Sequence, residues 1–325
     1  MYFNKNNKFY HGIMFHHFHD NEIHTKSQGS IDKDDFYKMI NFIGRNNILN
    51  ADVFYEKFKN NNLKDNEVCL SFDDAIKCQI DIALPVLEEL KIKSFFFVYT
   101  SLFEGKPDNL EFFRYLRMNY FKSVDEFYDK FYEVLDKDIN SFFEINKEKI
   151  EIIKKKYNFY SYEDIKFRLV RDIFLSKNEY EKNMFLMLKE FKVDTESLKS
   201  KLFFDEKDLI KLDELGHTIG LHSHNHPTKI ENLSYTEQMK EYSTNLNILT
   251  KILKKSSDYI KSSSHPCGSY NKNSLKVLKE LGIDFAFKDS MTVDYEMGMK
   301  HINNSSLEIA RQDHSEILKI MNIWK

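Results

Sequence analysis

The 325-residue chain contains little glycine, proline, tryptophan or cysteine: 9 Gly, 4 Pro, 1 Trp and 3 Cys. So few glycines and prolines exclude collagen-like and linker-like architectures and predict a chain made mostly of regular structure. The cysteines, Cys69, Cys78 and Cys267, are odd in number and form no C-x-x-C pair. They therefore argue against a disulfide framework and suit a reducing compartment.

Long hydrophobic runs and a strong excess of one charge are also absent. No stretch approaches the roughly 18 apolar residues of a membrane span, and the first residues lack the apolar core of a secretory signal. The 48 basic and 51 acidic side chains leave a net charge of -3, which gives no electrostatic reason to expect nucleic acid as a partner. We expect a cytoplasmic globular protein of one large or two ordinary domains, with no transmembrane segment and no nucleic-acid partner.

Short apolar runs alternate with amphipathic stretches in both halves of the chain. Buried strands are predicted at 68–72, 94–99, 218–221, 259–264 and 284–287, and helices at 79–90, 234–253 and 274–281. Pro85 should kink the first of these helices, while Ser234 and Glu237 form a capping box at the start of the second. Repeated βα units predict an α/β fold with a parallel sheet, either a barrel or a doubly wound sheet.

This rhythm is interrupted over residues 106–203, where the apolar period is helical and no strand is evident. We interpret 106–203 as a helical insertion between two parts of one barrel, 1–105 and 204–325. Its position after a strand would make it a lid or wall over the barrel mouth. A helical subdomain that adds core or a dimer interface fits the sequence equally well, and the oligomeric state is left open.

Two clusters of polar side chains follow predicted strands. Asp73 and Asp74 end the strand at 68–72, and LHSHNHP at 221–227 places three histidines after the strand at 218–221. The carboxyl ends of parallel strands are where α/β enzymes build their sites. One carboxylate with His222 and His226 would make a divalent metal site with open positions. The alternatives are a helix N-cap for the aspartates and a polar surface loop for the histidines.

The same segments resemble a known family. SFDDAIKCQIDIALPVLEELKIKSFFFV is similar to the first motif of the NodB-type polysaccharide deacetylases, the family 4 carbohydrate esterases, whose usual form is [ST]FDDG. LDELGHTIGLHSHNHP resembles their H-[ST]-x-x-H motif, and HPCGSYN, from 265 to 271, a divergent form of the third motif. The resemblance covers about residues 64–100 and 205–288, in the family's order. It implies an irregular (β/α)7 TIM-like barrel.

By position, the resemblance implies that Asp74, His222 and His226 bind a divalent metal and that Asp73 is the general base. Zinc is the first expectation on grounds of availability, and Co²⁺, Ni²⁺ and Fe²⁺ suit the same ligands.

The general acid is where the sequence departs from the family. The usual L-H-D-type strand end is missing, and the chain instead has LEIARQDHSEI near its end. We take His314 as the candidate acid, with Asp313 or Arg311 tuning it; a solvent-exposed position at a helix start is the alternative. His16 matches a histidine that many relatives carry after their first strand, so it is expected to line the substrate pocket or to donate the proton.

Two further departures concern the base. Ala75 replaces the usual glycine, which restricts the turn. The third motif lacks the arginine that often orients the base, so that Ser264 and His265 stand in its place. We expect His265 and Arg311 to contribute to substrate binding, and Arg311 to substitute for the missing arginine.

The first functional hypothesis is a metal-dependent hydrolase that removes an N-acetyl or N-formyl group from an amino sugar in surface glycan biosynthesis, with a nucleotide- or lipid-linked precursor as the expected substrate. Aromatic residues of the insertion, such as Phe112 and Phe113, would stack on sugar rings or simply form its core. A cyclic-amide hydrolase of the same barrel type is the second hypothesis. The third is a catalytically inactive glycan-binding barrel.

Overall fold

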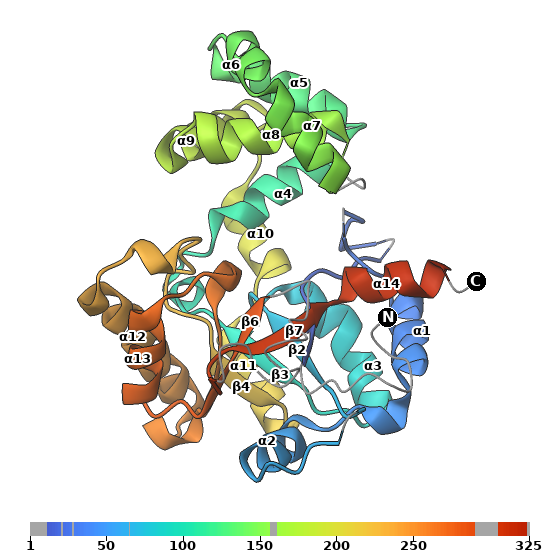
Figure 1. The fold of residues 1–325 in the computed structure, drawn as a ribbon, viewed down its shortest axis with the longest axis vertical. Coiled ribbons are helices and arrows are strands. Elements are labelled where there is room, and N and C mark those ends of the chain that lie inside the picture. The colour runs from blue at the N-terminus through green and yellow to red at the C-terminus, as the bar shows by residue number, and fades with distance from the viewer. Residues whose placement is uncertain are drawn as a thin grey trace. The chain divides into compact units, whose positions relative to one another are not determined.

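The computed structural model describes residues 12–20, 22–27, 29–64, 66–156, 161–289 and 305–323. Seven parallel strands close into a barrel in sequence order, with β7 pairing back onto β1 (Figure 1). They are β1 (Gly12–Phe15), β2 (Cys69–Asp73), β3 (Phe95–Val98), β4 (Thr218–Leu221), β5 (Ser262–Ser264), β6 (Phe285–Asp289) and β7 (Ile309–Asp313). The expected (β/α)7 barrel is confirmed.

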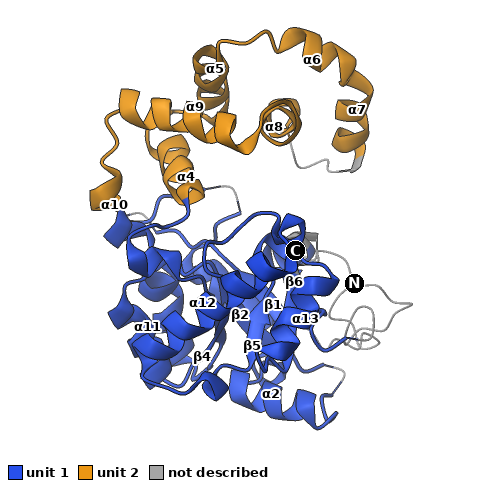
Figure 2. Ribbon diagram, turned by 90° about the vertical axis from the view of Figure 1, so that its left-hand side faces the viewer, with its two compact units in different colours: residues 1–108, 199–325 blue, residues 109–198 orange. Residues whose placement is uncertain are grey.

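Two compact units make up the chain, and Figure 2 colours them separately. Residues 1–108 and 199–325 form the barrel unit, and residues 109–198 form a helical unit whose limits lie inside the expected insertion, 106–203. The barrel unit contains α1 (Lys33–Ile43), α2 (Ala51–Lys59), α3 (Leu84–Glu89), α11 (Glu206–Glu214), α12 (Tyr235–Leu253), α13 (Lys272–Glu280) and α14 (His314–Ile323).

The barrel interior is filled by aromatic side chains. Phe95 and Phe97 of β3 meet Phe285 and Phe287 of β6 at ring-centroid distances of 5.6 to 5.8 Å. Gly220 of β4 permits this packing, because a Cβ at that position would lie 2.5 Å from the Phe97 ring. The close approach keeps β4 against the filled interior and so fixes the strand from which the histidine loop departs.

Helix boundaries in the barrel unit follow local sequence signals. The Ser234 side chain and Glu237 form the predicted capping box of α12. The segment predicted as one helix from 79 to 90 is wound as a π-helix over Gln79–Ala83 and as α3 over Leu84–Glu89. The change in winding lies just before Pro85, which has no N–H to donate to the preceding turn.

The helical unit has a core of its own. It comprises α4 (Asn109–Asn119), α5 (Val124–Leu135), α6 (Asn140–Ile145), α7 (Lys147–Lys156), α8 (Tyr162–Leu169), α9 (Lys177–Glu190) and the first half of α10 (Thr195–Leu202). Phe112 and Phe113 are buried, and the Phe113 ring packs edge-on against Tyr180. These aromatic residues therefore belong to the core of the unit. Across both units, none of the described helices is both long and apolar enough to cross a membrane.

The residue before β4, His217, should make the stability of the barrel depend on pH. Its Nδ1 accepts a hydrogen bond from the Ser94 backbone N–H at 3.1 Å, and burial lowers its pKa to about 4. The unfolded chain, with an ordinary pKa near about 6.5, takes up a proton that the folded chain excludes. The contribution of His217 to stability is therefore constant above about pH 6.5 and falls between about 6.5 and 4, by up to roughly 3 kcal/mol.

The measurement is the urea midpoint of the parent and of His217→Asn between pH 7 and pH 4.5. Asparagine keeps an acceptor for the Ser94 N–H but does not titrate in this range. The variant should lose a large part of the pH dependence but not all of it, because burial also lowers the pKa of His265 to about 4. Equal slopes in both proteins would contradict the assignment.

Candidate metal and catalytic site

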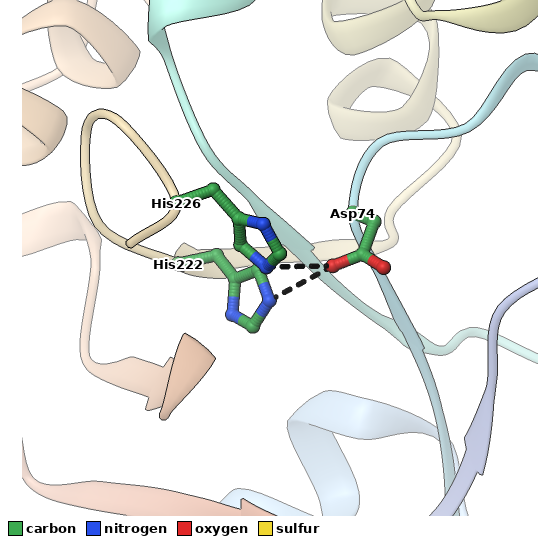
Figure 3. A group of neighbouring side chains, drawn as sticks. All are labelled: Asp74, His222 and His226. Carbon is green, nitrogen blue, oxygen red and sulfur yellow. Dashed lines mark hydrogen bonds and ion pairs between the residues drawn. The ribbon is translucent and has the colours of Figure 1, made fainter. Parts of the chain in front are cut away.

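The C-terminal ends of β2 and β4 deliver three side chains to one place. Asp74 follows the last residue of β2, and His222 follows the last residue of β4. The Asp74 Oδ1 atom lies 3.1 Å from His222 Nε2 and 3.2 Å from His226 Nε2, and both rings point at that oxygen (Figure 3). The three ligand atoms lie within 4.8 Å of one another.

The backbone around these residues is strained. Asp74 and Ala75 are consecutive left-handed residues, with φ of 74° and 51°, and His226 has φ of 51°. Residues other than glycine rarely adopt this region, and such strain clusters at functional sites. Ala75 therefore occupies a turn conformation that the family's usual glycine would adopt without cost.

Hydrogen bonds to the opposite ring nitrogens fix the orientation of both histidines. His222 Nδ1 donates to the Ser264 carbonyl oxygen at 2.9 Å, and His226 Nδ1 donates to Asp108 Oδ2 at 2.8 Å. Since these oxygens only accept, each Nδ1 carries a hydrogen, and each Nε2 is the nitrogen left to present a lone pair to a cation once it is free of a proton. This is the orientation required of metal-ligating histidines.

The three facing atoms fit a cation. The two Nε2 atoms each lie little over 3 Å from one carboxylate oxygen, and all three atoms can donate an electron pair to a cation that displaces the proton of His226. His226 Nε2 is buried and has no hydrogen-bond partner among the described residues. Although burial works in the opposite direction for both groups, their mutual attraction holds the pKa of Asp74 well below, and that of His226 well above, its usual value. The nitrogen and oxygen donors suit Zn²⁺, Co²⁺, Ni²⁺ or Fe²⁺.

Beside this group lies a buried ion pair. Arg311 Nη1 and Nη2 donate to Asp73 Oδ1 and Oδ2 at 2.7 and 2.6 Å, and the Ser264 hydroxyl donates to Oδ2 at 2.9 Å. Burial alone would raise the pKa of Asp73, but the Arg311 guanidinium lowers it below its usual value. Arg311 thus makes the contact that we expected from a substitute for the missing arginine, and its partner Asp73 is a carboxylate at neutral pH.

His16 lies on the open side of the group. It follows β1, its side chain is 27% exposed, and its Nε2 lies 3.8 Å from Asp74 Oδ2. The Gln79 side chain amide donates to the backbone carbonyls of both His16 and Asp73, at 3.0 and 2.7 Å, and so ties the end of β1 to the end of β2.

The structure contradicts the expected position of His314. Its ring is buried and stacked on Phe15, and its Nε2 and Nδ1 lie 2.7 Å and 3.3 Å from the carbonyl oxygens of Gly29 and Met14. Both nitrogens therefore face the backbone, because the turn from β7 into α14 directs the ring between β1 and the following loop.

His265 is likewise not open to a substrate. It is buried, stacks on Tyr270 at 4.3 Å and donates from Nε2 to the Leu307 carbonyl oxygen at 2.8 Å. Arg311 is also buried and is bound to Asp73. The expectation that these two residues bind substrate directly is wrong, because packing in the barrel has taken both side chains out of solvent.

The sequence patterns did not identify three residues that hold the histidine loop. Asn245 accepts from the His222 N–H at 2.9 Å, Glu241 accepts from the N–H groups of His224 and Asn225, and Asp108 binds His226. The two helical residues lie four apart on α12, a spacing that places them on the same face. Two polar residues four apart on an otherwise apolar helix face are a signal that the sequence contains. Asp108, in contrast, belongs to no recognisable sequence pattern.

The comparisons with known proteins agree with this geometry. Residues 172–286 match the family model described as polysaccharide deacetylase, a stretch that includes His222 and His226 but not Asp73 and Asp74. No curated protein matches the chain in sequence.

Several solved structures match almost the whole chain. The Streptococcus pyogenes deacetylase PplD in complex with acetate has a TM-score of 0.54 at 15% identity and covers 95% of this chain and 97% of that one. IcaB from Ammonifex degensii has a TM-score of 0.53 at 9% identity and covers 96% of this chain and 95% of that one. A de-N-acetylase from Aggregatibacter actinomycetemcomitans has a TM-score of 0.51 at 11% identity and covers 93% of this chain and 94% of that one. At such identities the likeness shows a common fold. The family match covers residues 172–286, and over that stretch the chain is similar to the polysaccharide deacetylases.

Proposed function

We propose that the protein is a metal-dependent hydrolase that removes an N-acetyl or N-formyl group from an amino sugar in surface glycan biosynthesis. The observation that carries this proposal is the pairing of two neighbouring carboxylates with different partners. Asp74 faces two histidine Nε2 atoms, while Asp73 is held by Arg311. Such a division suits one carboxylate for a cation and the other for a proton.

The residues of the site divide the work of amide hydrolysis. When bound by Asp74, His222 and His226, a divalent cation supplies Lewis-acid chemistry that polarises the acyl carbonyl and makes water more acidic. Asp73 accepts the proton of the attacking water at Oδ1, because Arg311 keeps the carboxylate ionised and Oδ1 has a second acceptor position beside its bond from Arg311. The amine that leaves must then gain a proton.

We assign that proton donor as His16. It is partly exposed and lies 3.8 Å from Asp74 Oδ2, whereas both nitrogens of His314 face backbone carbonyls. The prediction is that His16→Asn lowers kcat by roughly 10²- to 10⁴-fold, the usual contribution of one general acid. His314→Asn should lower the thermal midpoint and leave kcat within a few-fold of the parent.

Both variants are assayed at saturating metal, with metal content determined on the same samples. A kcat unaffected by His16→Asn, or a loss of turnover in a folded, metal-loaded His314→Asn protein, would reverse the assignment.

The substrate class is tested by release of the acyl product. Purified protein, supplied with Zn²⁺ or Co²⁺, is incubated with N-acetylated amino-sugar oligomers, with a nucleotide-linked N-acetyl amino sugar and with the cyclic amide allantoin. Release of acetate from the sugars by the parent protein, but not by the Asp73→Asn variant, supports the deacetylase. Ring opening of allantoin alone supports the cyclic-amide hydrolase, and no turnover of any compound by metal-loaded protein supports the inactive glycan-binding barrel. The buried Asp73–Arg311 pair favours an enzyme, because binding alone does not require two charges that are costly to bury.

A further inference from the structure

One contact of the site involves a residue that lies far from every motif. Asp108 Oδ2 accepts a hydrogen bond from His226 Nδ1 at 2.8 Å, and the side chain of Asp108 is only 17% exposed. Asp108 is also the last residue of the barrel unit before the helical unit begins at Asn109. The carboxylate therefore reaches the candidate ligand from the end of the segment that leads into the insertion.

The segment from β3 to Asp108 is held against the histidine loop at several points. The backbone N–H groups of Thr100 and Ser101 donate to the His224 carbonyl oxygen at 3.2 and 2.9 Å, and Lys106 N–H donates to the Ser101 carbonyl oxygen at 2.9 Å. The Tyr99 hydroxyl then accepts from the Asp108 N–H at 3.0 Å. The hydrogen bond from its backbone N–H therefore fixes the position of Asp108.

Tyr99 also supports the ring that Asp108 binds. Its side chain is buried, and its ring centroid lies 5.4 Å from that of His226. Tyr99 therefore packs against the ring of His226, and Asp108 fixes the direction in which its Nδ1 points. The other histidine, His222, has a backbone carbonyl in the corresponding place.

We infer that Asp108 is a positioning residue for metal binding: it holds His226 as the tautomer, and at the angle, that presents Nε2 to the cation. This inference rests on the proposed function, because it takes His226 as a metal ligand. A carboxylate on the remote nitrogen also makes the imidazole a stronger electron-pair donor than a neutral partner would. Loss of such a partner typically weakens metal affinity by about 10- to 100-fold.

The chain offers a matched control in the same segment. Glu104 Oε2 lies 3.6 Å from Nε2 of His224, the histidine of the same loop whose other nitrogen, Nδ1, contacts the Thr100 hydroxyl. Glu104→Gln therefore removes a carboxylate next to a histidine, two residues from His226, without touching the proposed ligand set. It should leave metal affinity unchanged.

The experiment measures Co²⁺ binding to the full-length protein by chelator competition and by the visible absorption of the bound ion. We expect Asp108→Ala to weaken the Kd for Co²⁺ by about 10- to 100-fold and to change the absorption spectrum. Asp108→Asn, which keeps an acceptor oxygen but no charge, should have a smaller effect, and Tyr99→Phe a loss of a few-fold. The thermal midpoint of each metal-free protein is recorded beside these values.

The outcomes separate the possible failures. If Asp108→Ala lowers the metal-free midpoint but binds Co²⁺ within twofold of the parent, Asp108 is only a structural ion-pair partner and the inference is overturned, while the proposed function stands. If Asp108→Ala does not fold, Asp108→Asn decides between the same two results. If the parent binds neither Co²⁺ nor Zn²⁺, the inference and the proposed function both fall.

Discussion

Asp73→Asn is expected to retain the metal and to lose turnover by roughly 10²- to 10⁴-fold, the range for removal of a general base. Asparagine has nearly the shape of aspartate and still accepts hydrogen bonds from Arg311 and Ser264, but it cannot take up the proton of water. The ligand atoms belong to other residues, so metal content per chain should equal that of the parent. The measurement is acyl-group release at saturating metal together with elemental mass spectrometry.

Loss of the Asp73 charge also has a cost for stability. Arg311 is fully buried, and Asp73→Asn leaves its guanidinium without a counter-ion. Breaking one side of a buried pair costs about 3–5 kcal/mol. The double variant Asp73→Asn/Arg311→Met removes both charges and should recover part of this loss while staying inactive. The inactivity would then be assigned to the missing base, because it persists in a protein that is more stable than the single variant.

A folded, metal-loaded Asp73→Asn protein that turns over at the parent rate would overturn the base assignment. A protein that loses metal as well as activity would mean that Asp73 helps to hold the cation and that the roles of the two aspartates are not separate.

Local sequence patterns predict most of the strands of the barrel but not the first strand and the last one. Strands β2, β3, β4 and β6 are apolar runs with clear flanking signals, and each lies within about one or two residues of its expected place. Strands β1 and β7, which close the barrel, are as long as these four, yet their surrounding sequence lacks the flanking signals that mark a strand. Their pairing with each other is a property of the closed barrel and appears only in the fold.

The candidate site shows the same limit. Asp73, Asp74, His222 and His226 occur in two compact motifs, and their places after two strands, together with the resemblance of the motifs to a known family, predict the chemistry. The contacts of Arg311 with Asp73 and of Asp108 with His226 span 238 and 118 positions, so no local pattern indicates either. His314 stands beside Asp313, which suggested a tuned acid, but the direction of its ring depends on how α14 leaves β7.

His222→Ala and Asp74→Asn are expected to abolish stoichiometric metal binding, and with it activity. His222→Ala removes one of the three atoms that face a common centre, and Asp74→Asn replaces the anionic carboxylate by a neutral amide, so neither variant holds a divalent ion with comparable affinity. The parent should bind close to one ion per chain. Because a ligand that binds only the folded state stabilises it, metal at about 100 times its Kd should stabilise the parent by roughly 2.7 kcal/mol. Neither variant should show that increase.

His224→Ala is the matched control for both variants. His224 lies between the two candidate ligands in sequence, but its Nδ1 contacts the Thr100 hydroxyl, so the substitution should leave the stoichiometry near one. His222 is buried, so His222→Ala opens a cavity and could lose metal because the protein is destabilised. Asp74→Asn controls for this, because the partly exposed Asp74 side chain changes only in charge. Metal retained by Asp74→Asn and His222→Ala would place the ion elsewhere. A parent that binds no metal even after incubation with Zn²⁺ or Co²⁺ would favour the inactive glycan-binding barrel, since Asp73 would then have no Lewis acid beside it.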